Sequence, residues 1–208
     1  MATLKLPPEW HNVQGSQAIH VQNDVATLKL QLPQANQGQG GPIHVQNDVA
    51  TLKHGLGEAA AHDAQIDPGD YLQLSSSVTF QVMAIDANAP DANSASIVIK
   101  MSYGTVDFLF EGDAPSAVEA QMMSNPAFNL DVEILKVGHH GSSSSTSDAF
   151  LTATNPAVAV ICVGAGNSYG HPTTQTLGRL SDHGVTVYRT DLDGTVAIST
   201  NGTTWVVS

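Results

Sequence analysis

The sequence predicts an α/β or α+β fold, in which helices pack on a β-sheet. Short apolar segments of strand type recur from about residue 66 to the C-terminus, and turn residues separate them. Several of these segments are joined by short helical patterns, whereas others are joined by tight turns typical of antiparallel hairpins. Strands linked in both ways indicate a mixed sheet covered by helices. The 208 residues are enough to bury a core, and one domain is the default expectation.

The first strands are predicted directly after the turn DPGD. The segments YLQL and SVTFQVMAI alternate or run apolar as strands do, and the connector 86–95 follows them. The next two strands, SIVIKMSYG and TVDFLFEGD, are joined near Tyr103-Gly104 and are predicted to form a hairpin. Residues 115–125 are then predicted to form a helix opened by Pro115.

The remaining segments alternate strands with helices. LDVEILKVG and AVAVICVG are predicted strands, and SDAFLTATN between them is a short helix with Ser147 or Asp148 as its cap. HPTTQTLGRLSDHG is a helix ended by Gly184, and VTVYRT is a strand. The C-terminal segment GTVAISTNGTTWVVS is predicted to be a hairpin over Asn201-Gly202.

The N-terminal region, residues 1–65, carries an internal repeat. The segment ATLK begins at Ala2, Ala26 and Ala50, a spacing of 24 residues. Near-identity between copies suggests a recent tandem duplication rather than a solenoid, because repeat folds usually need three or more complete units. Its apolar residues recur at the spacing of one helical face, as at Val45, Val49, Leu52 and Leu56. We therefore predict a duplicated helical segment over 1–65.

The composition argues against several classes of protein. Lys and Arg number 7 against 19 Asp and Glu, a formal net charge of −12, so no basic surface is available to bind a long nucleic acid. The single cysteine, Cys162, excludes an intramolecular disulfide and a cysteine-rich zinc site. No apolar run of about 18 residues and no leader of signal-peptide type is visible. We expect a soluble protein without a membrane span, and its compartment stays open.

Ionisable side chains follow three successive predicted strands. Asp113 follows VDFLFEG, His139 and His140 follow EILKVG, and His171 comes after AVAVICVGAGNSYG. Residues just beyond the carboxyl ends of strands form the sites of many sheet-based folds. Taken singly, a Gly-Asp is often a turn and a His-Pro often opens a helix. Together, carboxylate and imidazole groups suit zinc, manganese or iron.

A family resemblance lies in four stretches: NSASIVIKMSYGTVDFLFEGD, LDVEILKVGHHGSSSSTSDAF, NPAVAVICVGAGNSYGHP and VYRTDLDGTVAIST. In this order and spacing, they resemble the C-terminal half of a metallo-β-lactamase-superfamily domain, specifically the hydrolase-like domain of ComEC-type competence proteins. The resemblance runs from about residue 67 to residue 202. It implies an αββα sandwich that holds one or two divalent metal ions at one edge, most simply zinc.

The resemblance also implies a role for each polar residue of this edge. Asp113 matches an aspartate that bridges two metal ions, and His140 matches the last metal ligand. His139 would then face the phosphate or the leaving oxygen of the substrate. His171 matches a histidine near the site, where a role towards the substrate fits better than direct ligation. Ser142 would cap the following helix or offer its hydroxyl to a phosphate.

The chain departs from the family in the first half of the domain. The His-x-His-x-Asp-His motif, which supplies most metal ligands in the family, does not occur, and residues 1–65 hold the repeat instead. Residues 66–208 are therefore predicted to be a C-terminal half-domain. Asp113 and His140 alone would bind a metal weakly. Further ligands would come from His54, His62 or Asp63, or from a second chain.

Two functions follow from these observations. The first is a metal-dependent hydrolase that acts on a phosphodiester or a related small phosphate ester. The second is a truncated half-domain that acts as a binding or structural module without catalysis. In either case a half-sandwich would expose the inner face of its sheet unless the repeated segment or a partner chain covered it, so a homodimer is plausible.

Overall fold

The fold centres on a mixed β-sheet. The computed structural model describes residues 67–73, 77–86 and 88–208, and it assigns strands at 17–22, 25–29, 44–46 and 49–51. Seven strands form the central sheet in the order β11-β10-β9-β8-β7-β6-β5. In chain order they are β5 (Tyr71–Gln73), β6 (Val78–Ala84), β7 (Val98–Tyr103), β8 (Val106–Phe110), β9 (Ile134–Lys136), β10 (Val158–Ile161) and β11 (Thr186–Arg189).

The direction of the strands changes within this sheet. Strands β8, β9, β10 and β11 run parallel, whereas β5, β6, β7 and β8 pair antiparallel. The predicted hairpin of β7 and β8 is confirmed, with Tyr103 opposite Val106 in the register. Because β8, β9 and β10 are parallel neighbours, their carboxyl ends meet at one edge, which is the edge where the sequence places Asp113 and the histidines.

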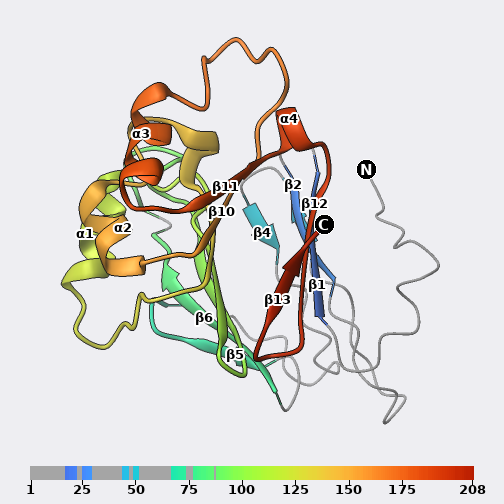
Figure 1. Cartoon of the computed structure of the whole chain (residues 1–208). Coiled ribbons are helices and arrows are strands. Elements are labelled where there is room, and N and C mark those ends of the chain that lie inside the picture. Colours follow the sequence, from blue (N-terminus) through green and yellow to red (C-terminus); the bar gives the residue numbers. More distant parts are fainter. Residues whose placement is uncertain are drawn as a thin grey trace.

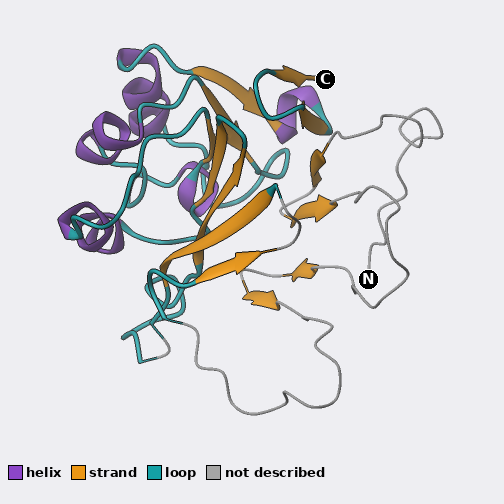
Figure 2. Ribbon diagram, turned by 90° about the horizontal axis from the view of Figure 1, so that it is seen from below, coloured by secondary structure: helices purple, strands orange, loops and turns teal. Residues whose placement is uncertain are grey.

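Helices cover one face of the central sheet (Figures 1 and 2). The helices of this layer are α1 (Ser116–Ser124), α2 (Asp148–Thr154) and α3 (Thr174–Asp182). All three lie where the sequence predicts them. Pro115 occupies the N-cap position of α1, and the side chain of Ser147 caps α2 by accepting a hydrogen bond from Phe150 N. Phe150 and Leu180 are fully buried between these helices and the sheet, so the helical layer carries one half of the core.

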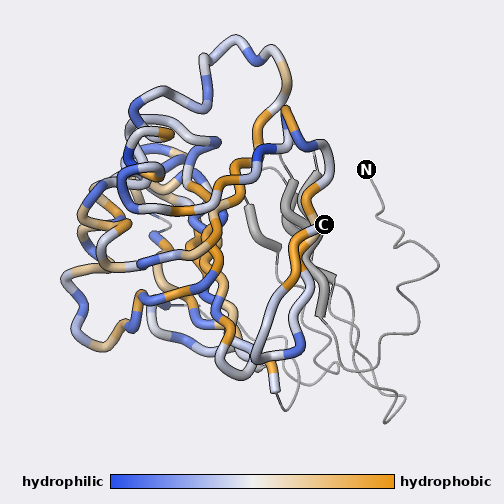
Figure 3. Tube along the Cα trace, in the orientation of Figure 1, coloured by the Kyte–Doolittle hydropathy of each residue, from blue (hydrophilic) through white to orange (hydrophobic). Residues whose placement is uncertain are grey.

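A second, smaller sheet packs on the opposite face. Its order is β13-β12-β1-β2, in which β1 is Gln17–Gln22 and β2 is Val25–Lys29. The C-terminal hairpin consists of β12 (Val196–Thr200) and β13 (Trp205–Val207). Val196 and Ile198 of β12 are buried against Phe108 and Val160 of the central sheet. The central strands consequently contribute apolar residues to clusters on both faces, and Figure 3 shows hydrophobic residues along these strands.

Strand β10 illustrates how the sequence specifies this layering. Val158 and Val160 contribute to the apolar cluster beside the second sheet, whereas Ala159 and Ile161 contribute to the cluster beneath the helices. All four residues are buried. Successive side chains of a strand point to opposite faces, so a continuous apolar run is what a strand needs when both faces are covered.

The helical prediction for residues 1–65 is wrong for the segments that the structure describes. These segments are strands: β1 (Gln17–Gln22), β2 (Val25–Lys29), β3 (His44–Gln46) and β4 (Val49–Thr51). The sequence IHVQ alternates apolar and polar residues with the period of a strand, and Gln22 pairs with Val25 across a two-residue connection. The apolar spacing fits both a helix and paired short strands, and pairing between strands decides in favour of the latter.

Strand β1 also pairs with β12, from Gln17 opposite Thr200 to Val21 opposite Val196. The two predicted parts of the chain, 1–65 and 66–208, are thus joined by backbone hydrogen bonds in one sheet. The described residues form a mixed α/β structure of helices, central sheet and second sheet. The complete αββα sandwich stays a prediction from the resemblance.

Candidate functional site

The four predicted site residues lie in three loops at the carboxyl ends of β8, β9 and β10. Asp113 follows β8, His139 and His140 lie in the short 3₁₀ segment Gly138–Gly141 after β9, and His171 lies in the loop after β10. Backbone hydrogen bonds tie these loops together. His139 N donates to Gly112 O over 2.9 Å, and Thr173 N donates to Gly141 O over 2.9 Å.

His140 is oriented by its contact with a backbone carbonyl. Its Nδ1 atom lies 2.7 Å from the oxygen of Cys162, at the end of β10. A carbonyl can only accept, so this contact places a proton on Nδ1, and the neutral form of the ring then has its lone pair on Nε2. The Nε2 atom lies 3.5 Å from Asp113 Oδ1. An imidazole held by a carbonyl through one nitrogen is the usual arrangement of a histidine that ligates metal through the other.

Asp113 is buried beside this ring, with 6% of its surface exposed. Its backbone N–H donates to Ser96 Oγ over 3.1 Å. Its Oδ1 atom is buried and receives no hydrogen bond from the described residues. A buried carboxylate oxygen without a donor is costly, and a cation at this position would stabilise it.

The backbone of the double histidine is unusual. His139, His140 and Gly141 have φ angles of 45°, 53° and 84°. Left-handed backbone costs a residue other than glycine of order 1–3 kcal/mol. Gly141 is required for a second reason, because a Cβ atom there would lie 2.5 Å from Pro172 Cβ. Such strain is common in functional loops, where the surrounding structure holds it.

His139 and His171 face each other at the rim of this edge. Their ring centroids are 5.6 Å apart and the rings are nearly perpendicular, at 82°. Ser144 Oγ lies 3.5 Å from His139 Nδ1, at the limit of a hydrogen bond. Tyr169 stacks on His171 with 6.0 Å between centroids and is 82% exposed. The rim therefore presents imidazole, hydroxyl and aromatic groups to a ligand.

The pKa of His171 is lowered from its ordinary value of 6.5. Partial burial is the main cause, and the charges of His139 and His140 add to it, while Asp113 opposes them. His171 is therefore neutral at neutral pH. Because the folded-state pKa lies below the unfolded one, this group's contribution to stability is present above the unfolded pKa and is lost as the pH falls through the folded pKa.

We expect an NMR titration of the histidine rings to give His171 a pKa below 6.5 in the folded protein. In His139→Asn, this pKa should rise towards the ordinary value, because one nearby positive charge is removed. His183, on the far end of α3, serves as a reference resonance that the substitution should not move. A His171 pKa at or above 6.5 in the wild-type protein would contradict this account.

Two buried acids behind the histidines were missed by sequence reasoning. Glu111 and Glu119 are both 0% exposed. Burial, followed by the charge of the neighbouring Glu119, raises the pKa of Glu111 well above its ordinary value of 4.5. The available signal was the position of Glu111 at the end of the apolar run VDFLF, where a charged residue needs a special reason.

The described residues contain no cluster of three or more His, Cys, Asp or Glu side chains arranged to hold a metal ion. Within them, Asp113 and His140 form a pair. His54, His62 and Asp63, which the sequence offers as further ligands, lie outside the described residues. The known part of the site is therefore two candidate ligands together with a rim of two histidines.

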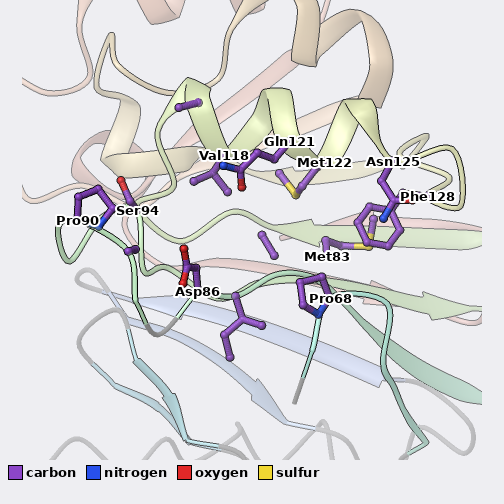
Figure 4. A pocket seen from close by; sticks show the side chains of 14 residues that line it. Pro68, Met83, Asp86, Pro90, Ser94, Val118, Gln121, Met122, Asn125 and Phe128 are labelled. Atoms are coloured by element: carbon purple, nitrogen blue, oxygen red, sulfur yellow. The ribbon is translucent and has the colours of Figure 1, made fainter. Parts of the chain in front are cut away.

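A cavity of about 240 Å³ lies elsewhere, between α1 and the chain around β6 (Figure 4). Met83, Met122 and Phe128 give it a mainly apolar lining, and Asp86 and Gln121 are among its polar residues. None of the four predicted site residues lines it. The cavity is thus separate from the histidine edge.

The fold and the histidine edge define an α/β domain with a carboxylate–imidazole pair at the ends of parallel strands. No family model matches the chain. It is 35% identical over 133 residues to ComE operon protein 3 of Bacillus subtilis (strain 168), which covers 64% of the chain and 17% of that relative. It is 38% identical over 104 residues to competence protein ComA of Neisseria gonorrhoeae, with 50% of the chain and 15% of the relative covered.

A third relative is recombination protein 2 of Haemophilus influenzae, 36% identical over 107 residues that cover 51% of the chain and 13% of the relative. The chain is thus similar to proteins of the ComEC-type competence family, the family that the sequence resemblance names. The chain spans less than a fifth of the length of each of them. Among the described residues, no helix has the length and apolar character that crossing a bilayer requires.

Proposed function

We propose that this chain forms part of a metal-dependent hydrolase of the metallo-β-lactamase superfamily, acting on a phosphodiester or a related small phosphate ester. The observation that carries the proposal is the pair of Asp113 and His140. A buried carboxylate oxygen that receives no hydrogen bond from the described residues lies 3.5 Å from an imidazole nitrogen. The similarity to competence proteins agrees with the family resemblance from which the proposed hydrolase activity is inferred.

The residues of this pair fit a divalent cation. Carboxylate oxygen and imidazole nitrogen are ligands of zinc, with manganese and iron as alternatives. The carbonyl of Cys162 orients the imidazole of His140. A histidine that binds metal through one ring nitrogen is usually held through the other nitrogen in this way. The chemistry that such a cation supplies is activation of water and polarisation of a phosphoryl oxygen. Further ligands would come from residues outside the described ranges or from a second chain.

The rim residues would act on the substrate. His171 is neutral at neutral pH because its pKa is lowered. It can therefore accept a hydrogen bond or a proton from the attacking water. His139 and Ser144 offer hydrogen bonds to a phosphate oxygen or to the leaving oxygen. Tyr169, exposed and stacked on His171, would contact the organic group of the ester.

Metal removal tests this proposal. Protein purified without added metal is expected to contain close to one divalent ion per site, measured by mass spectrometry of the elements. It should hydrolyse bis(4-nitrophenyl) phosphate, lose the activity after treatment with a chelator, and regain it when zinc or manganese is returned. The proposal would be overturned if the purified protein contained no metal and did not hydrolyse the ester, whether or not zinc or manganese was added.

The second candidate function is a binding or structural module without catalysis. The observation that favours it is the lack of a third metal-binding side chain near Asp113 and His140 among the described residues. The metal measurement separates the two functions. In a homodimer the partner would supply further ligands, so that a half-domain would still form a complete metal site. Light scattering with and without zinc would detect such a dimer.

A further inference from the structure

The loop 138–146, called here the histidine loop, has a backbone that needs external support. Its residues His139, His140, Gly141 and Thr146 all have positive φ angles, of 45°, 53°, 84° and 54°. For a β-branched residue such as threonine, this conformation is a genuine outlier. Conformations of this kind persist only where the surrounding structure fixes them.

Glu111 contacts both ends of the histidine loop. Gly138 N donates a hydrogen bond to Glu111 Oε2 over 2.8 Å, and Thr146 Oγ1 donates to the same oxygen over 3.1 Å. The first contact also explains the glycine, because a Cβ atom at position 138 would lie 2.7 Å from Glu111 Cδ. A single carboxyl group thus joins the residue at which the loop begins to the residue at which it ends.

Glu119, on helix α1, fixes the end of the loop a second time. Thr146 N donates to Glu119 Oε1. Ser147 N and Ser147 Oγ both donate to Glu119 Oε2, over 3.0 Å and 2.6 Å. Glu111 and Glu119 thus both bind Thr146, Glu111 through its hydroxyl and Glu119 through its backbone amide. The two carboxyl groups therefore hold the end of the loop through one shared residue.

We propose that Glu111 and Glu119 are positioning residues: they form a carboxyl clamp that holds the two ends of the histidine loop and thereby sets His140 against Asp113. The second half of this proposal rests on the proposed function of that pair. Glu111 is linked to both Asp113 and His140. One glycine separates it from Asp113 in the sequence, and it binds the loop that carries His140.

Stability alone is a poor explanation of the two acids. Two fully buried carboxyl groups carry a large desolvation cost, and apolar side chains of similar volume usually pack a core at least as well. The hydrogen bonds of the clamp go instead to the backbone and hydroxyl groups of one strained loop. The arrangement is the one expected where a loop must hold ligating side chains in a fixed geometry.

Substitutions at position 111 test the clamp. Glu111→Met removes its hydrogen bonds with little change of volume, whereas Glu111→Gln keeps a carbonyl oxygen that can accept from Gly138 N and Thr146 Oγ1. Glu133→Met is the matched control. Glu133 Oε2 also accepts from a backbone amide, Asp107 N, over 2.6 Å, but it does so at the opposite end of β8 and β9.

The first measurement is amide hydrogen exchange of the metal-free protein. In Glu111→Met the amides of Gly138, His139 and Thr146 are expected to exchange at least about tenfold faster, while those of β10 keep their protection. Glu111→Gln and Glu133→Met should leave the loop amides within about threefold of the wild type. Unchanged loop exchange in folded Glu111→Met would overturn the clamp, whether or not the protein binds metal.

The second measurement is the affinity for zinc and for manganese, determined by calorimetry. Removing a residue that orients a ligand typically costs about 10–100-fold in metal affinity, and we expect a loss of this size in Glu111→Met and recovery in Glu111→Gln. A wild type without metal binding refutes the proposed function and leaves the exchange result to decide the clamp. If Glu111→Met does not fold, Thr146→Val, which removes the hydroxyl that donates to Glu111 and accepts from Gly138 N, takes its place in both measurements.

Discussion

Asp113→Ala is expected to abolish measurable metal binding and, with it, hydrolysis of bis(4-nitrophenyl) phosphate. The substitution removes one of two candidate ligands in the described part of the site, including a buried oxygen that receives no hydrogen bond there. A divalent ion held by few protein ligands loses most of its affinity when one is removed. Metal content of the purified protein, calorimetry with zinc and the rate of ester hydrolysis should therefore fall together.

Two comparisons make this result specific. Asp131→Ala, at an exposed position before β9, removes the same carboxylate charge away from the histidine edge and should leave all three quantities within about twofold, as surface substitutions usually do. Asp113→Ala should also remain folded, because its oxygen contributes no hydrogen bond among the described residues. Metal content and hydrolysis equal to those of the wild type in Asp113→Ala would refute the role assigned to this residue.

Phe150→Ala is expected to lower the free energy of unfolding by about 3–5 kcal/mol. The Phe150 side chain is fully buried, in the apolar cluster between the helical layer and the central sheet. Its removal costs the transfer free energy of the ring and leaves a cavity that the surrounding β-sheet cannot collapse to fill. Denaturant unfolding followed by circular dichroism measures the change directly.

Thr152→Ala is the matched control on the same helix. Thr152 is exposed, and its Oγ1 atom donates to the carbonyl oxygen of Asp148 within the helix. Alanine favours helices, so this variant should stay within about 0.5 kcal/mol of the wild type. A loss below about 1 kcal/mol in Phe150→Ala would mean that α2 contributes little to the core, contrary to its burial.

The sequence predicted the strands of residues 67–208 and the helices α1, α2 and α3 because each carries a strong local signal, whereas the short helical segments Gly138–Gly141 and Thr190–Asp193 were not predicted. The apolar run of β10 has a length typical of strands, the β7–β8 hairpin has a glycine at its turn, and α2 has a serine cap. The N-terminal repeat offered no such signal. The spacing of its apolar residues fits the period of a helix as well as that of a strand. Pairing with a neighbouring strand decides between them, since β1 pairs with β12 from the far end of the chain.

The candidate site was predictable in its positions but not in its geometry. Strand ends indicated Asp113 and the histidines, and parallel pairing of β8, β9 and β10 brings their loops to one edge. The carbonyl of Cys162 as partner of His140, and the two glutamates beneath the loop, depend on tertiary contacts between residues far apart in the sequence. No local pattern encodes such contacts. The metal, the substrate and the catalytic roles stay predictions.

The three loops of the histidine edge are bonded to one another as well as to the strands that precede them. Gly112 O receives the amide of His139, and Gly141 O receives the amide of Thr173. A segment cannot open without breaking bonds to its neighbour, so the edge should unfold as one cooperative unit rather than loop by loop. Evolutionary change in this region would accordingly be correlated: a substitution tolerated in one loop would depend on the residues present in the other two.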